Sequence, residues 1–493
     1  MDEPAKGQSA STPDTSSASR RQLALTLLVA GTFFMENLDG TILATAAPPM
    51  ARSLGVDSAA ISIAITAYLL TLAVLIPASG WLTERFGARR IFVTAIVIFT
   101  VASALCALST SLPELTVMRV LQGVGGAMMV PVGRLTVLRV TAKKDLVRAI
   151  AWLTWPALAA PVIAPVVGGA ITTYATWPWI FLINVPLGAV AFVAALILVP
   201  REAALVRHPL DWRGLLLTCF GLGLLVYVGA ALSGTDLHWI QIAVAGGIGA
   251  ICVAAAVRHF LRSRHPLLNL REFRIETFRV TNAGGSLFRL TISAVPFLFP
   301  LFFQDALGWT PLQAGSVVLV LFLGNLVIKP ATTPLLMRFG FRPVLIVSTA
   351  GAVITMALAT MLTASTPLVF VLVLLFLSGV TRSVGFTVYN TMSFADVPDL
   401  EMSEANTLAS TVQQVAAGFG VAVGAVALRV GTPVAAWLDS SHTGGTADQT
   451  AAFHVAFAII AIIAVVPVVE AIVLSRSAGE NIRPVRSRRT SAG

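Results

Sequence analysis

Charged residues are scarce in this chain. Lys, Arg, Asp and Glu make up 11% of its 493 residues, whereas they make up about a quarter of a soluble domain. Cysteine is also rare, and all three cysteines lie within apolar runs, so no disulfide framework is expected. The six histidines are never clustered at the spacing of metal ligands. These deficits exclude an ordinary cytosolic enzyme, and neither a metal site nor a catalytic constellation is expected.

Long apolar runs are what the chain has instead. Apolar residues make up 56% of the sequence, and the mean hydropathy is +0.86. One helical crossing of a bilayer takes about 20 mostly apolar residues. Fourteen stretches meet this requirement, near residues 22–48, 60–82, 90–110, 114–137, 149–174, 179–199, 211–233, 238–258, 281–304, 312–336, 343–363, 367–391, 404–429 and 452–475. The sequence therefore predicts an all-α integral membrane protein with 14 spans.

The basic residues are concentrated on one side of this predicted topology. Of the 33 Lys and Arg residues, 27 lie in loops or span ends on the same side as Arg20 and Arg21, two lie on the other side, and four lie within spans. Positively charged loops remain in the cytoplasm. We therefore expect a multi-pass protein of the plasma (inner) membrane with both termini cytoplasmic. Because the net charge of +10 is sorted by membrane side, no nucleic-acid partner is expected.

One short segment occurs twice. Gly80–Phe92, after the second span, has a weaker echo in Leu335–Pro343 after the tenth, and 253 residues separate both Gly87 from Gly340 and Arg89 from Arg342. Two homologous bundles are implied. The predicted parts are a disordered cytoplasmic N-terminus (1–21), an N-terminal six-helix bundle (22–199), two extra spans with a cytoplasmic amphipathic connector (200–280), a C-terminal six-helix bundle (281–475) and a basic cytoplasmic tail (476–493).

Five motifs follow one another along the chain. They are Leu38–Ile42 in the first span, the Gly80–Arg90 loop, Arg119–Gly123 in the fourth span, Pro165–Gly169 in the fifth and Trp179–Pro186 opening the sixth. With these motifs the sequence, from about residue 22 to 475, resembles the 14-helix branch of the drug:proton antiporters in the major facilitator superfamily, the EmrB/QacA type, and within it the MdtD-like exporters. The resemblance implies the major facilitator fold, with two six-helix bundles plus two extra central transmembrane helices.

The resemblance also implies roles for two motifs. The loop after the second span would gate the rocking of the two halves, because its glycines permit tight helix ends and its charges can form a breakable latch. The fifth-span motif is the antiporter signature of the relatives, although a merely kinked helix is the alternative. The gating-loop residues are Gly80, Glu84, Arg85, Gly87, Arg89 and Arg90, and the antiporter-motif residues are Pro161, Pro165, Gly168 and Gly169.

Proton coupling is assigned to Glu36, Asp39 and Arg119. The two acids are three residues apart and share one face of the first span, about 21 and 25 Å from its inner end at 1.5 Å per residue. Carboxyl groups at that depth are costly, and they can hold a shared proton. Arg119, at a similar depth in the fourth span, can pair with Asp39, and the matching arginine of the relatives is implicated in proton transfer. A static pair that holds two helices together is the alternative.

The second half contributes cations to the predicted substrate cavity. Arg289, Lys329 and Arg382 lie about 10–13 Å from the inner ends of their helices and form a basic layer. Snorkelling to the cytoplasm is the alternative. Uncharged polar residues can read substrate polarity or join helices through hydrogen bonds. The predicted cavity residues are Gln122, Arg289, Asn325, Lys329, Arg382, Tyr389, Asn390 and Gln414.

Three functions remain open on these residues. The first is a proton-coupled antiporter that exports amphipathic or drug-like compounds by alternating access. The basic layer favours a second, an exporter of organic anions such as metal-chelating carboxylates. The third, a non-transporting membrane sensor, is disfavoured, as is an enzyme, because no nucleotide loop or catalytic constellation is present. No cofactor is expected beyond the proton gradient. The expected partners are a small-molecule substrate, protons and membrane lipids, with a periplasmic adaptor as a further candidate.

Overall fold

The computed structural model describes residues 15–141, 146–201, 209–233, 238–264, 266–398, 401–438 and 447–474. The first half of the chain forms helices throughout. They are α1 (Thr15–Leu54), η1 (Ser58–Ile61), α2 (Ser62–Phe86), α3 (Ala88–Leu108), α4 (Leu112–Val140), α5 (Leu146–Tyr174), α6 (Trp179–Leu182) and α7 (Asn184–Leu198). Because α1 begins at Thr15, residues 15–21 of the expected disordered segment are helical, and residues 1–14 lie outside the described residues. The basic tail lies outside the described residues.

The remaining helices follow the same pattern. They are α8 (Trp212–Ser233), α9 (Trp239–Arg262), η3 (Leu270–Arg274), α10 (Glu276–Leu301), η4 (Phe302–Ala306), α11 (Pro311–Val327), α12 (Lys329–Phe339), α13 (Phe341–Ala359), α14 (Leu368–Ser393), α15 (Met402–Leu438) and α16 (Ala447–Val473). In the described residues, 13 helices are long and apolar enough to cross a membrane, and the pair α11–α12, bent by 47°, makes a fourteenth. The predicted all-α fold with 14 spans is confirmed.

Glycine at a left-handed position ends a helix at the two repeated segments. Gly87 (φ 85°) separates α2 from α3, and Gly340 (φ 90°) separates α12 from α13. Each of these φ values is strained for a residue that carries a Cβ atom. The arginine two residues later reaches a helix end in both halves: Arg89 Nη2 donates to the Leu196 carbonyl of α7, and Arg342 Nη2 donates to the Ile472 carbonyl of α16 at 2.6 Å. The two halves thus repeat a contact as well as a sequence.

Direct packing between the two halves is concentrated towards one end of the molecule. We call the end with Gly87 and Gly340 the basic end, and the opposite end, where α5 finishes and α11 begins, the far end. At the far end Thr173 Oγ1 accepts a hydrogen bond from Leu312 N at 3.1 Å, and Gln304 Nε2 donates to the Thr45 carbonyl at 2.9 Å. One apolar core includes residues of both halves there, whereas nearer the basic end each half has a separate core.

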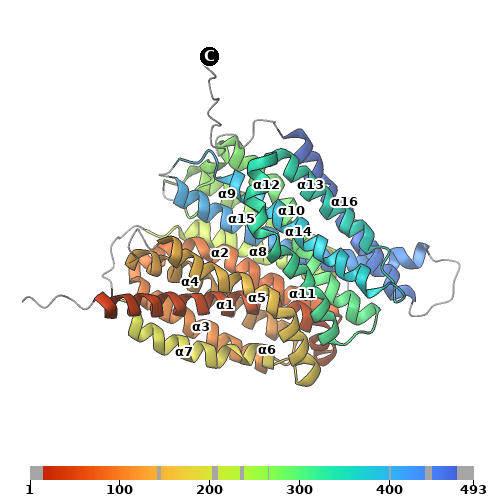
Figure 1. The fold of residues 1–493 in the computed structure, drawn as a ribbon, viewed down its shortest axis with the longest axis horizontal. Coiled ribbons are helices and arrows are strands. Elements are labelled where there is room, and N and C mark those ends of the chain that lie inside the picture. Colours follow the sequence, from red (N-terminus) through yellow and green to blue (C-terminus); the bar gives the residue numbers. More distant parts are fainter. Residues whose placement is uncertain are drawn as a thin grey trace, which may run out of the picture.

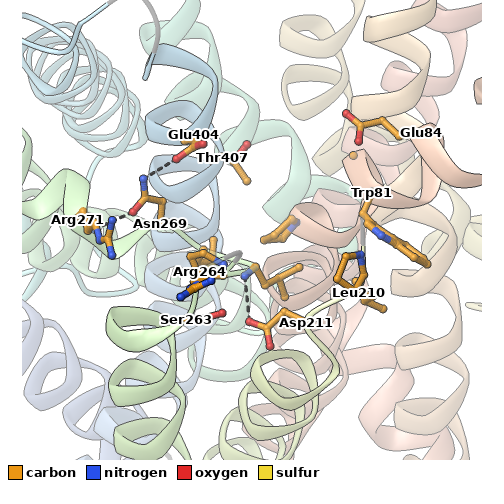
Figure 2. Close-up of a pocket in the computed structure, with 16 residues that line it drawn as sticks. Trp81, Glu84, Leu210, Asp211, Ser263, Arg264, Asn269, Arg271, Glu404 and Thr407 are labelled. Atoms are coloured by element: carbon orange, nitrogen blue, oxygen red, sulfur yellow. Dashed lines mark hydrogen bonds between the residues drawn. The ribbon is translucent and has the colours of Figure 1, made fainter. Parts of the chain in front are cut away.

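A polar cavity separates the halves at the basic end. It has a volume of about 570 Å³ and lies between Trp81 and Glu84 of α2, the connector after α9, and Glu404 and Thr407 of α15. Figure 2 shows these groups facing one another across the cavity. The helices α8 and α9 pack together beside this seam, with α8 against both α2 and α15 (Figure 1). The structure is therefore closed at the far end and hollowed at the basic end.

The connector is tied to the second half through a buried acid. Glu272 in η3 is 2% exposed. Its Oε1 accepts a hydrogen bond from Asn269 Nδ2 at 3.1 Å, and the same amide donates to Glu404 at 2.5 Å. Burial, and then the nearby Glu401 and Glu404 carboxylates, raise the pKa of Glu272 from 4.5 to about 7. This carboxyl is therefore largely neutral in the folded protein below pH 7.

The raised pKa predicts a loss of stability as the pH rises. Between pH 4.5 and 7 the folded state holds a proton on Glu272 that the unfolded state releases, so the folded state loses stability across that window. Glu272→Gln removes this loss. We expect its unfolding temperature in detergent to exceed that of the wild type by several degrees at pH 8 and to match it at pH 4.5. The exposed Glu276→Gln is the control, and an equal effect of Glu272→Gln at both pH values would contradict the expectation.

Candidate polar network and cation layer

The Asp39 carboxylate is the centre of a buried hydrogen-bond network inside the first half. Its Oδ2 accepts from Arg119 Nη1 at 2.5 Å. Its Oδ1 accepts from Gln122 Nε2 and from Asn184 Nδ2, each at 2.9 Å. Neither side chain of the Asp39–Arg119 pair is exposed. Three helices, α1, α4 and α7, thus converge on one charge.

Helix α4 presents two polar groups from one face. Arg119 and Gln122 are three residues apart and so lie one turn from each other. Arg119 Nη1 also donates to Gln122 Oε1 at 2.6 Å, and Gln122 Nε2 donates to Ser103 Oγ of α3 at 2.7 Å. Glycine brings the helices together, since a Cβ atom at Gly125 would lie 2.6 Å from the Phe99 backbone nitrogen. The close packing holds the amide in place.

The Arg119 guanidinium depends on Asp39 for its neutralisation. It lies 4.1 Å from the ring centre of Tyr68 and 5.8 Å from that of Phe181, at distances typical of cation–π contacts. Its Nε and Nη2 are buried without a hydrogen-bond partner in the described residues. A buried ion that loses its counter-charge is strongly destabilised. Protonation of Asp39 therefore favours a rearrangement that gives Arg119 another partner or water.

Glu36 lies beside this network but not in it. The side chain is partly buried and accepts a hydrogen bond from Asn37 Nδ2 at 3.0 Å. Both Glu36 Cγ and the Tyr68 hydroxyl lie within 4 Å of the Cβ position of Gly126. The Tyr68 hydroxyl therefore lies near the Glu36 side chain, and the Tyr68 ring stacks on the Arg119 guanidinium. Of the two acids, Glu36 is the more accessible and Asp39 the fully enclosed.

Two of the three predicted cations of the second half come together. Arg289 Nη2 donates to Asn390 Oδ1 at 2.8 Å, and Lys329 Nζ donates to Thr387 Oγ1 at 3.2 Å. Both charges lie within about 6 Å of the Phe386 ring centre. Neither has an ion pair in the described part of the chain. This cation cluster, formed by Arg289 and Lys329 around Phe386, is the best-defined polar feature of the second half.

The other predicted cavity residues are dispersed. Arg382 lies 5.7 Å from the Phe322 ring centre and borders a different, small cavity. Tyr389 is buried and packs on Phe288 at 5.4 Å. Gln413, which is outside the predicted set, donates to Asn390 at 3.2 Å. Gln122 belongs to the Asp39 network rather than to the cation cluster. The side chains of Asn325 and Gln414 are half-buried. Neither side chain makes a hydrogen bond to another described residue.

The predicted gating loop lies at the basic end. Gly80 is inside α2 with open space around it, and Glu84 borders the polar cavity without an ion pair to another described residue. Arg89 holds the end of α7 through a backbone carbonyl. Arg85 lies in the last turn of α2 and Arg90 in the first turn of α3. Of the predicted loop residues, Gly80 and Glu84 thus border the space between the halves, whereas Arg89 contacts its own half.

The predicted antiporter motif is placed where α5 meets two neighbours. A Cβ atom at Gly168 would lie 2.7 Å from Ile42 of α1, and one at Gly169 would lie 2.4 Å from the Pro311 carbonyl of α11. On the opposing helix, a Cβ atom at Gly315 would lie 2.0 Å from the Pro165 carbonyl. Helix α5 passes through Pro156, Pro161 and Pro165 without a break. The motif therefore forms the far-end contact between the halves.

Asn184 and Tyr68 were not predicted as site residues. Asn184 lies within the Trp179–Pro186 motif, and a polar amide opening an apolar helix is a signal for an interhelical hydrogen bond. Tyr68 is one of only four tyrosines in the chain. Its role depends on the packing of α2 against α4, which no spacing along one helix reveals.

Two helical bundles joined at one end, with buried polar groups inside them, are the architecture of many secondary transporters. The solved structures agree on the fold. A D-xylose-proton symporter superposes with a TM-score of 0.64 at 15% identity over 93% of this chain and 98% of its own. A bacterial homologue of the human lysosomal transporter Spinster gives a TM-score of 0.64 at 14% identity over 95% of this chain and 99% of its own.

The sequence comparisons identify the family. The Major Facilitator Superfamily profile matches residues 29–289 and 281–492. The chain is 39% identical to the putative multidrug resistance protein MdtD of Escherichia fergusonii over 84% of this chain and 88% of that protein. An MdtD of Escherichia coli is equally similar over 81% of this chain and 85% of its own. The chain belongs to the Major Facilitator Superfamily, and it is a multi-pass membrane transporter rather than an enzyme. The expected resemblance to MdtD-like members is confirmed.

Proposed function

We propose that this protein is a proton-coupled antiporter that exports small amphipathic or drug-like compounds across the inner membrane by alternating access. The observation that carries the proposal is the fully buried Asp39–Arg119 pair. A carboxylate enclosed with one cation and two amide donors is stable while it is charged. Proton binding cancels its charge, so it changes the balance between two arrangements of the surrounding helices.

The proposed cycle uses the two ends of the molecule in turn. With the basic end taken as cytoplasmic, the state described here receives cargo from the cytoplasm through the polar cavity. Opening of the α5–α11 contact exposes the far end, where cargo leaves and a proton enters. Glu36, the more accessible acid, lies where it can pass this proton to Asp39 by way of Tyr68. Reclosure of the far end and repair of the Asp39–Arg119 pair return the proton to the cytoplasm.

The test is substrate-driven proton movement in proteoliposomes. Purified protein is reconstituted with a pH-sensitive dye inside, and candidate compounds are added under an imposed pH gradient. An added compound meets the cytoplasmic face of the molecules that are oriented inside out, so its uptake into the lumen drives protons out and raises the pH that the dye reports. If a broad panel is transported without proton movement, the coupling proposal is wrong. If no compound moves, a membrane sensor becomes the better description.

The cation cluster favours organic anions as a second class of cargo. Arg289 and Lys329 lie around the same Phe386 ring, and neither forms an ion pair with a described acid, so a carboxylate-bearing compound would supply a counter-charge. We expect Arg289→Ala to weaken binding of tricarboxylates by at least ~10-fold and to leave binding of cationic dyes unchanged. A thermal-shift panel measures both. Arg382→Ala, which alters a cation outside the cluster, is the matched control, and equal anion binding in all three proteins would exclude the anion site.

A further inference from the structure

A second cavity lies between the extra helix pair and the second half. Its volume is about 590 Å³, which is within the range of sites for drug-sized ligands. Its walls are formed by α8, α9, the connector, α10 and α15, and they are almost wholly apolar. Representative lining residues are Leu222, Val257, Phe273, Leu287, Val415 and Phe419. The polar cavity at the basic end shares only Leu268 with it, so the two are different spaces.

One carboxylate borders this apolar cavity. Glu470, in the last turns of α16, is the only charged residue among those that line it. Its Oε2 is buried and has no hydrogen-bond partner in the described part of the chain. The carboxylate lies directly against α10 at Gly284, where a Cβ atom would be 2.1 Å from Oε2. The glycine therefore leaves the space in which the carboxylate sits.

A carboxylate oxygen that is buried without a partner is costly in apolar surroundings. A cationic group would remove that cost, and the neighbouring apolar walls would take up hydrocarbon. An anionic ligand such as a phosphate would find no cationic partner in this cavity, because no Lys or Arg lines it. Val257, a lining residue of α9, is 42% exposed on the membrane-spanning surface. A ligand dissolved in the bilayer can thus reach the cavity.

We propose that the cavity between α8–α9 and α10–α15 is a binding site for lipophilic cations, with the positive centre beside Glu470 and the hydrocarbon against the apolar walls. The site is separate from the Asp39 network and from the cation cluster. Binding at this site requires no transport cycle, so a test of binding is independent of a test of the proposed antiport. In an exporter, such a site would collect compounds from the membrane layer next to the basic end.

Tetraphenylphosphonium and tetraphenylborate provide a test, because the two ions have nearly the same size and shape and opposite charges. Saturable binding of each is measured to the full chain in phosphatidylcholine nanodiscs, with empty nanodiscs subtracted. We expect the cation to bind and the anion to bind at least ~10-fold more weakly at this site. We also expect Glu470→Gln to weaken cation binding by at least ~10-fold. No cation binding, or equal binding of both ions, would overturn the proposal.

Two further variants keep the test decisive. Val415→Trp places a bulky side chain in the cavity and leaves Glu470 in the sequence, and we expect it to abolish cation binding even if Glu470→Gln does not fold. Retention of cation binding in Val415→Trp would assign the cation to another region of the protein and refute the site. Glu276→Gln, in the same helix as Gly284 but outside the lining, is the control for a general effect of removing an acid.

Discussion

Asp39→Asn is expected to reduce substrate-driven proton movement in proteoliposomes by at least ~100-fold, because its amide cannot take up and release the coupled proton and leaves the Arg119 charge buried without a counter-charge. Asparagine has nearly the same shape and keeps an oxygen for the Gln122 and Asn184 amides. It carries neither the proton nor the charge that neutralises Arg119. The variant should therefore be unable to use a pH gradient, while any residual movement of substrate runs only down its own gradient.

Glu36→Gln is the matched comparison for Asp39→Asn. Glu36 is on the same helix but makes no contact with Arg119 in the structure, and its hydrogen bond is to Asn37. We expect this variant to keep coupling with a slower rate. If both variants lose coupling equally, the two carboxyl groups act as a unit. Undiminished coupling in Asp39→Asn would remove the basis of the proton-site assignment.

Gly315→Val is expected to hold the protein away from the far-end-closed state and to abolish transport. A Cβ atom at this position would lie 2.0 Å from the Pro165 carbonyl, well inside van der Waals contact, and backbone on both sides leaves little room to relax. Cysteines at Thr173 and Leu312, whose Oγ1 and backbone nitrogen are 3.1 Å apart, report on closure through the yield of a disulfide crosslink. The yield should fall several-fold in the Gly315→Val background.

Gly247→Val provides the control for helix propensity and hydrophobicity. Gly247 also lies in a membrane-spanning helix, but nothing lies within 4 Å of its Cβ position. Crosslinking and transport should both be unaffected by this change. Normal crosslinking in Gly315→Val would mean that α5 and α11 can close with a side chain between them, contrary to the contact described.

The span count and the Asp39–Arg119 pair were predictable from sequence for the same reason. A bilayer excludes unpaired charge and irregular backbone, so apolar runs mark the helices and the few charges inside them mark candidate partners. Depth along a helix follows from residue count alone. Asn184 was not predictable in this way, because its amide meets Asp39 only when α7 is packed beside α1. The break at Ile328, which places Lys329 at the start of α12, likewise has no periodic signal.

The insertion between the halves consists of two helices because an even number of added membrane crossings keeps the second half in the same orientation as the first. The matching turns at Gly87 and Gly340 both lie at the basic end, so the second half stands the same way up as the first. A single inserted span would turn the second half over and place its turn at the opposite surface. The α8–α9 hairpin is thus the smallest membrane-crossing insertion that preserves the orientation of everything after it. Any enlargement of this fold between its halves must come in multiples of two crossings.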